Sequence, residues 1–199
     1  PLIAECLQHV IARRDCWLPR YDFKTSLRTD RAQLLPAQEN GLVIVEGLHA
    51  MNPVISESLP KFAICNVFVS VSTNINENGV RILSGRKIRF LRRMVRDALY
   101  RGASVAHTLS LWPNVLAGED RYLYPYKSRA DVAFDTFHRY EVGVLAHYAR
   151  GFAPNVIGSE FLDYVMNGAS KFCAVDPELV PQDSLIREFI PGGIYEHIY

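Results

Sequence analysis

Glu46 is the first residue whose position indicates chemistry, because it follows an uninterrupted apolar run at residues 42–45. Such a run is typical of a strand buried on both faces of a parallel sheet. Ligands of open α/β sheets collect where the strands end, and a carboxylate there can hold Mg²⁺ directly or through water. Gly47 would let the backbone pass close to a bound group. Glu46 is therefore a candidate magnesium ligand, although a helix cap or an ion pair with an arginine stays open as an alternative.

A second candidate functional region is the basic segment from Arg81 to Arg101, which contains eight basic residues and one acid, Asp97. Its net charge is +7, which leaves −6 for the rest of a chain whose total is +1. On a helical wheel, an apolar arc at Ile88, Leu91, Val95, Ala98 and Leu99 adjoins a basic arc of about 100°. The basic arc contains Arg89, Arg92, Arg93 and Arg96.

This row of arginines predicts a phosphate-related role. Guanidinium groups bind phosphate oxygens in a bidentate way and keep their charge, which suits them to a transferring phosphoryl group. We expect the row to face a cleft that contains Glu46, and we expect neutralisation of Arg92 or Arg96 to change thermal stability little. A merely solvated basic face and a nucleic-acid-binding helix are the alternatives. The second would need further basic residues elsewhere, where the charge is −6.

The other reactive side chains lack the spacing of a catalytic or metal site. The six histidines have no metal-ligand spacing, and no serine lies in a Gly-x-Ser-x-Gly elbow. The four cysteines are scattered without a CxxC pair, which is typical of the reduced thiols of a cytoplasmic protein. His49 stays a candidate neighbour of a ligand at Glu46.

Apolar periodicity predicts the elements that would position these side chains. A helix is expected over residues 2–14, and a polar connection between Pro19 and Pro36. Strands alternating with helices indicate an α/β domain with a mainly parallel sheet flanked by helices. The expected strands are residues 42–45, 64–71, 131–134 and 155–157, and the expected helices are residues 88–100, 137–148 and 184–189.

Length and composition fit one globular domain. The chain has 199 residues, of which 49% are hydrophobic, enough for a sizeable core. No apolar run approaches the roughly 18 residues that span a bilayer, so no membrane partner is expected. We predict a single domain over residues 1–199 with a tail at about residues 171–199.

Several segments, taken in order, resemble the phosphoribulokinase/uridine kinase family of P-loop kinases, and more closely its bacterial uridine kinase-like branch. They cover most of the chain and are specific only as a set. The segments are residues 19–25 (PRYDFKT), 43–49 (VIVEGLH), 92–97 (RRMVRD) with Arg101-Gly102, 112–114 (WPN) running on to Gly118-Glu119, and 187–190 (REFI).

The resemblance implies a P-loop kinase-like α/β fold with an Arg-rich helical lid at about residues 81–120. It implies transfer of the ATP γ-phosphoryl group to a hydroxyl of a nucleoside or related sugar, with Mg²⁺ as cofactor. Glu46 would belong to the Mg-ATP site. Substrate contacts would come from Tyr21, Phe23, Ser26 and Arg28. The lid arginines would divide into a catalytic pair, Arg92 and Arg96, and an ATP-binding pair, Arg89 and Arg93.

Two departures from the family pattern matter. Ser26 stands where pyrimidine kinases of the family carry a histidine, so uridine itself is in doubt as substrate. No G-x-x-x-x-G-K-[ST] motif occurs, and the nearest segment, residues 84–87 (SGRK), lacks both the lysine and the hydroxyl. In the family that loop, the general base and the N-terminal strands precede the position where this sequence starts.

The chain is therefore expected to be the substrate, magnesium and lid portion of a kinase, inactive by itself. A degenerate relative that binds nucleotide or a protein partner without catalysis is the main alternative. A nucleic-acid-binding module is less favoured, and a homo-oligomer is left open.

Overall fold

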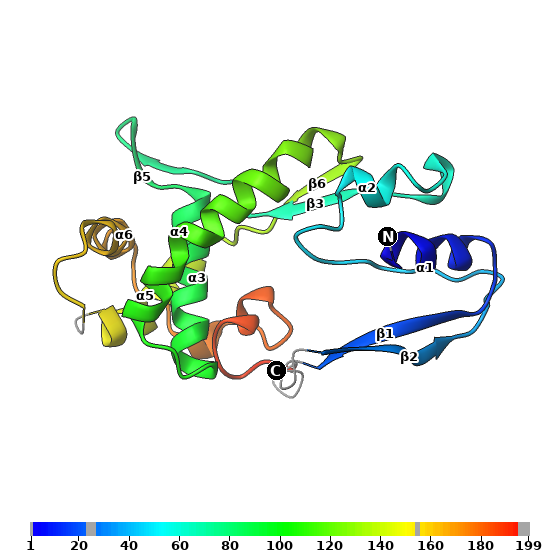
Figure 1. Cartoon of the computed structure of the whole chain (residues 1–199). Helices are drawn as coiled ribbons and strands as arrows, with labels where there is room; N and C mark the ends of the chain where they lie inside the picture. The colour runs from blue at the N-terminus through cyan, green and yellow to red at the C-terminus, as the bar shows by residue number, and fades with distance from the viewer. Residues whose placement is uncertain (1, 23–26, 154–155, 195–199) are drawn as a thin grey trace. The chain divides into compact units, whose positions relative to one another are not determined.

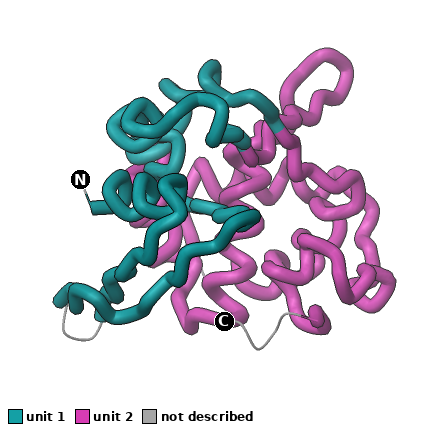
Figure 2. Tube along the Cα trace, turned by 90° about the vertical axis from the view of Figure 1, so that its right-hand side faces the viewer, with its two compact units in different colours: residues 1–68, 117–133 teal, residues 69–116, 134–199 magenta. Residues whose placement is uncertain are grey.

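The computed structural model describes residues 2–22, 27–153 and 156–194. The chain divides into two compact units, Pro1–Phe68 with Ala117–Ala133, and Val69–Leu116 with Phe134–Tyr199 (Figure 2). We call them unit 1 and unit 2. The assignment of all 199 residues to one domain, with its lid and tail, stays a prediction.

Unit 1 begins with the predicted helix and continues with a hairpin. Helix α1 (Leu2–Ile11) confirms the helical periodicity, and it buries Ala4 and Cys6. Strands β1 (Cys16–Asp22) and β2 (Leu27–Leu35) then pair antiparallel (Figure 1), so the predicted polar connection is wrong. Nearly every residue of β2 is exposed, and a strand without a buried face carries no apolar alternation to identify it. Short helices complete the unit: α2 (Pro53–Ser56), η1 (Lys61–Ala63) and η2 (Tyr124–Arg129).

The predicted buried strand at residues 42–45 is also wrong. These residues have no regular secondary structure, and Leu42 and Ile44 are 87% and 84% exposed. A strand buried on both faces needs hydrogen-bonding neighbours and covering helices. Within the described ranges, no strand pairs with this segment. An apolar run alone therefore did not make a strand here.

Two parallel strands carry the α/β character of the fold. Strand β3 (Val67–Ser70) lies beside β6 (Val132–Asp135) in Figure 1, which confirms the strands expected near these positions. The amide of Val132 donates to the Asn66 carbonyl, and the amide of Thr136 to the Ser70 carbonyl. Pairing that advances in the same direction along both strands is parallel. Their carboxyl ends therefore meet at one edge. The strand expected at residues 155–157 lies partly outside the described residues, and residues 156–157 form none.

Unit 2 holds the hydrophobic core, which is built around the predicted arginine helix α3 (Gly85–Tyr100). Ser84 caps this helix, since its Oγ accepts the Lys87 amide at 3.4 Å, so the segment that imitates a phosphate loop is a helix start. Helix α3 packs against α5 (Glu141–Phe152), the helix expected at residues 137–148. Ile88, Leu91 and Val95 are fully buried, as the wheel predicts.

The rest of unit 2 includes elements that the sequence pattern did not reveal. These are the hairpin β4 (Ile75–Glu77) and β5 (Val80–Leu83), the helix α6 (Glu160–Ser170), and the helix α4 (Val105–Tyr122), whose residues 117–122 belong to unit 1. Pro113 inside α4 interrupts the helical signal. The tail forms the short 3-10 helices η4 (Pro177–Leu179) and η5 (Leu185–Glu188), the second where a helix was expected. None of the described helices has the length and apolarity that crossing a membrane requires.

Candidate functional site

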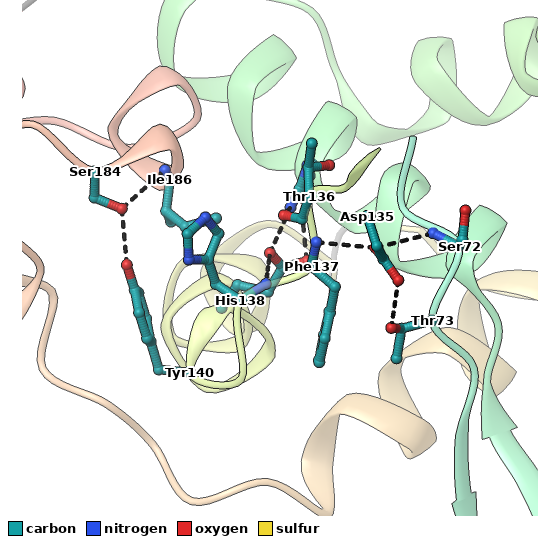
Figure 3. Close-up of polar contacts among 11 residues, drawn as sticks. Ser72, Thr73, Asp135, Thr136, Phe137, His138, Tyr140, Ser184 and Ile186 are labelled. Atoms are coloured by element: carbon teal, nitrogen blue, oxygen red, sulfur yellow. Dashed lines mark hydrogen bonds and ion pairs between the residues drawn. The ribbon is translucent and has the colours of Figure 1, made fainter. Parts of the chain in front are cut away.

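The carboxyl ends of β3 and β6 gather polar groups around Asp135. Its carboxylate accepts hydrogen bonds from Thr73 Oγ1 at 2.6 Å and from the amides of Ser72 and Phe137, both at 3.1 Å (Figure 3). Burial by itself raises the pKa of Asp135, but these bonds outweigh it and lower the pKa on balance. The carboxylate thus ties the loops that follow the two strands.

We expect Asp135→Asn to destabilise unit 2 at neutral pH by on the order of 1 kcal/mol. A carboxylate whose folded pKa is lowered stabilises the fold above its unfolded pKa, and this stabilisation disappears as the pH falls through the folded pKa. Urea unfolding of both proteins at pH 7 and at pH 3 checks this. The difference between them should shrink at pH 3, and an equal difference at the two pH values would contradict the assignment.

Arg92 lies at the same strand end and is buried in an ion pair. Its Nη2 donates to Glu141 Oε2 at 2.5 Å and to the Thr136 carbonyl at 2.7 Å, and its Nε donates to Glu141 Oε1 at 3.3 Å. The Arg92 side chain is 8% exposed and that of Glu141 is 0% exposed. The premise that the Arg92 charge faces solvent is therefore wrong. Because a buried charge depends on its partner, we now expect neutralisation of Arg92 to lower stability.

Arg93 and Arg96, also on the basic arc, are half-buried and paired with acids. Arg93 Nε lies 3.2 Å from Asp97 Oδ2, and Arg96 Nη1 donates to Glu188 Oε1 at 3.1 Å. Burial lowers the pKa of Arg96 and neighbouring Arg101 adds to this, while Glu188 and Asp97 oppose it. Glu188, which is remote in sequence, thus offsets part of the local charge of +7. The assignments of Arg89 and Arg93 to ATP, and of Arg92 and Arg96 to catalysis, stay predictions.

Glu46 lies in unit 1, where it is exposed and directly precedes the turn at residues 47–50. The neighbouring His49 ring packs edge-on against Tyr122 of α4, with 4.7 Å between the ring centroids. Gly47 has φ 140°, a conformation that favours glycine, and its carbonyl accepts the Ala50 amide at 3.1 Å. His49 is therefore engaged with an aromatic ring. That the arginines face a cleft containing Glu46 stays a prediction, since the two belong to different units.

Two of the four predicted substrate residues, Tyr21 and Arg28, lie on the hairpin of unit 1. Tyr21 and Arg28 are directly opposite in the antiparallel register, so the structure brings this pair together. Arg28 Nε also lies 2.8 Å from Asp30 Oδ1. Phe23 and Ser26 lie outside the described residues. Two exposed, cross-strand side chains of this kind can contact a ligand without any change in the hairpin backbone.

The donor set limits which metal this chain could bind. Across residues 2–22, 27–153 and 156–194, no group of three or more His, Cys, Asp or Glu side chains could hold a metal ion. Mg²⁺ is usually bound by one or two carboxylates, several waters and substrate phosphates. A single exposed carboxylate such as Glu46 fits that kind of site and does not fit an all-protein cage.

Sequence reasoning missed the partners of the arginines. Glu141 and Thr136 are 49 and 44 residues from Arg92, and Glu188 is 92 residues from Arg96. The one available signal was that Glu141 interrupts an otherwise apolar helix pattern. An isolated acid among Val142, Val144 and Leu145, all fully buried, must find a partner.

Two parallel strands whose carboxyl ends gather charged and hydroxyl groups, together with the helices of the chain, define a mixed α/β protein. Residues 2–142 match the model of the Phosphoribulokinase / Uridine kinase family. The chain therefore belongs to this kinase family, which confirms the resemblance seen in the sequence. No curated protein and no solved structure matches the chain.

Proposed function

We propose that this protein is part of an ATP-dependent phosphotransferase of the uridine kinase type, which phosphorylates a hydroxyl of a nucleoside or a related sugar. The family match over residues 2–142 carries this proposal. In such a reaction the acceptor oxygen forms a bond to the γ-phosphorus while the bond to the leaving oxygen of ADP breaks. The acceptor hydroxyl loses its proton to a base. Catalysis rests mainly on positioning and on neutralising phosphate charge.

Within this proposal the arginines of α3 have different roles. Arg92 uses its donors on Glu141 and Thr136, so its first contribution is to hold the helix on the strand end. The Arg96 side chain is 19% exposed and that of Arg93 is 27% exposed, although each is paired with an acid. The exposed part of each guanidinium has donors to offer to phosphate oxygens.

Mg²⁺ would neutralise charge on the ATP phosphates, and Glu46 is the residue that would hold it, directly or through water. The hairpin carrying Tyr21 and Arg28, with Phe23 and Ser26 between them in sequence, would contact the acceptor. A pocket that recognises a pyrimidine by hydrogen bonding rejects other bases. Because Ser26 stands where the pyrimidine kinases of the family carry a histidine, we expect this protein to accept a broader range of acceptors.

We expect Glu46→Gln to lower kcat at least about tenfold, because an amide is a weaker magnesium ligand than a carboxylate. The measurement is phosphoryl transfer from Mg-ATP to a panel of nucleosides and sugars by the complete natural protein. The exposed Glu39 provides a matched control, and Glu39→Gln should leave kcat unchanged.

Two outcomes would count against this. Equal kcat for the parent and Glu46→Gln at saturating magnesium would remove Glu46 from the metal site. Tight ATP binding by the parent without transfer to any acceptor would favour a non-catalytic nucleotide-binding relative.

A further inference from the structure

The C-terminal segment at residues 184–190, which we call the tail clamp, is anchored in the core of unit 2. Ile186 and Ile190 are fully buried, and Phe189 is nearly so. Ser184 Oγ accepts the Ile186 amide at 3.2 Å and lies 2.7 Å from the Tyr140 hydroxyl (Figure 3). The clamp lies beyond residues 2–142, so the family match assigns it no role.

The tail clamp contacts the arginines of α3 directly. Glu188 Oε1 accepts a hydrogen bond from Arg96 Nη1 at 3.1 Å. The Phe189 ring lies under two guanidinium groups, with its centroid 5.1 Å from Cζ of Arg92 and 5.8 Å from Cζ of Arg96. A carboxylate on one edge and an aromatic ring on one face restrict both the position and the plane of a guanidinium.

The two arginines differ in what else holds them. Arg92 has Glu141 and Thr136 as partners outside the tail clamp. Within the described residues, Arg96 has a hydrogen bond to Glu188 and a longer ion pair with Asp97 at 3.8 Å. Arg96 is therefore the side chain whose orientation depends on the clamp. An unrestrained arginine would lose rotamer entropy on binding phosphate, and the clamp reduces that cost.

We propose that Glu188 and Phe189 are positioning residues that hold the Arg96 guanidinium ready for a phosphate oxygen of the nucleotide. This proposal rests on the proposed function, because it assigns the phosphate contact to the phosphotransfer site. Glu188 acts through Arg96 and does not itself touch the reacting groups.

The test compares Glu188→Gln with Glu178→Gln in the complete natural protein. Glu178 is an exposed acid of the same tail that lies outside the tail clamp, so it controls for loss of one charge. We expect Glu188→Gln to lower kcat about five- to tenfold with little change in the KM of the acceptor, because Arg96 stabilises charge in the transition state. Glu188→Asp should recover part of the loss, and the melting temperature should move little.

A second readout does not depend on activity. The ¹H–¹⁵N resonance of Arg96 Nε should move toward the position of a freely rotating arginine in Glu188→Gln and stay unchanged in Glu178→Gln. An unmoved resonance, or equal kcat for the two variants, would overturn the positioning role. A parent protein without transfer to any acceptor would instead contradict the proposed function, and the Arg96 resonance would then decide by itself whether the tail clamp orients this side chain.

Discussion

Replacing Glu141 by Gln is expected to lower the free energy of unfolding by about 3–5 kcal/mol, a large effect for a single substitution. The change leaves the buried Arg92 guanidinium without a counter-charge, and it weakens the acceptor of the His138 amide, now 3.1 Å from Glu141 Oε2. Urea unfolding followed by circular dichroism measures the loss.

Glu160 offers a matched control for this change. It is also the first residue of a helix, α6, but it is exposed. Glu160→Gln should lose less than about 1 kcal/mol, the usual value of an acid at a helix start. The double variant Arg92→Met with Glu141→Met should lose less than Glu141→Gln, because it removes both buried charges. Equal losses for Glu141→Gln and Glu160→Gln would show that the ion pair is not buried in solution.

Gly85→Ala is expected to destabilise unit 2 by about 1–3 kcal/mol. A Cβ at this position would collide with the carbonyl oxygen of Val71 and lie 3.0 Å from its carbonyl carbon. Because both are backbone atoms, the start of α3 would have to move away from the end of β3. The melting temperature and the urea midpoint are the measurements.

Gly151 is the control for the loss of glycine itself. It lies in α5, and a Cβ added there would meet no described atom of another element within 4 Å. Gly151→Ala should therefore stabilise the protein by about 0.5–1 kcal/mol, since alanine favours helix. A Gly85→Ala variant as stable as the parent would mean that α3 does not begin this close to β3.

Both predictions concern the same part of the fold, where the end of β3, the start of α3 and the end of β6 lie close together. Gly85 sets how closely α3 approaches Val71, and Arg92, two helical turns further on, reaches Thr136 after β6. A substitution that shifts α3 should therefore also disturb the arginines that we assign to phosphate binding. Stability and phosphoryl transfer are best measured on the same variants, so that a change in helix position is not mistaken for a lost ligand contact.

The sequence by itself determined the elements whose signal is local. The 3.6-residue periodicity predicted α3, and the buried faces of Ile88, Leu91 and Val95 are where it placed them. The helix at the N-terminus and strands β3 and β6 also followed from apolar patterns, although β3 has only the four residues Val67–Ser70 of the expected strand at residues 64–71. The ordered motifs indicated the family, which the match over residues 2–142 confirms.

Tertiary structure decided what surrounds these elements. The wheel put four arginines on one arc, but whether an arginine faces solvent or a carboxylate depends on residues such as Glu141 and Glu188, which are distant in the chain. Residues 42–45 have the composition of a buried strand, yet they are exposed, because burial requires neighbours that no local pattern specifies. Periodicity reports which face of an element is apolar, and only the packed chain determines which partner that face and its charges meet.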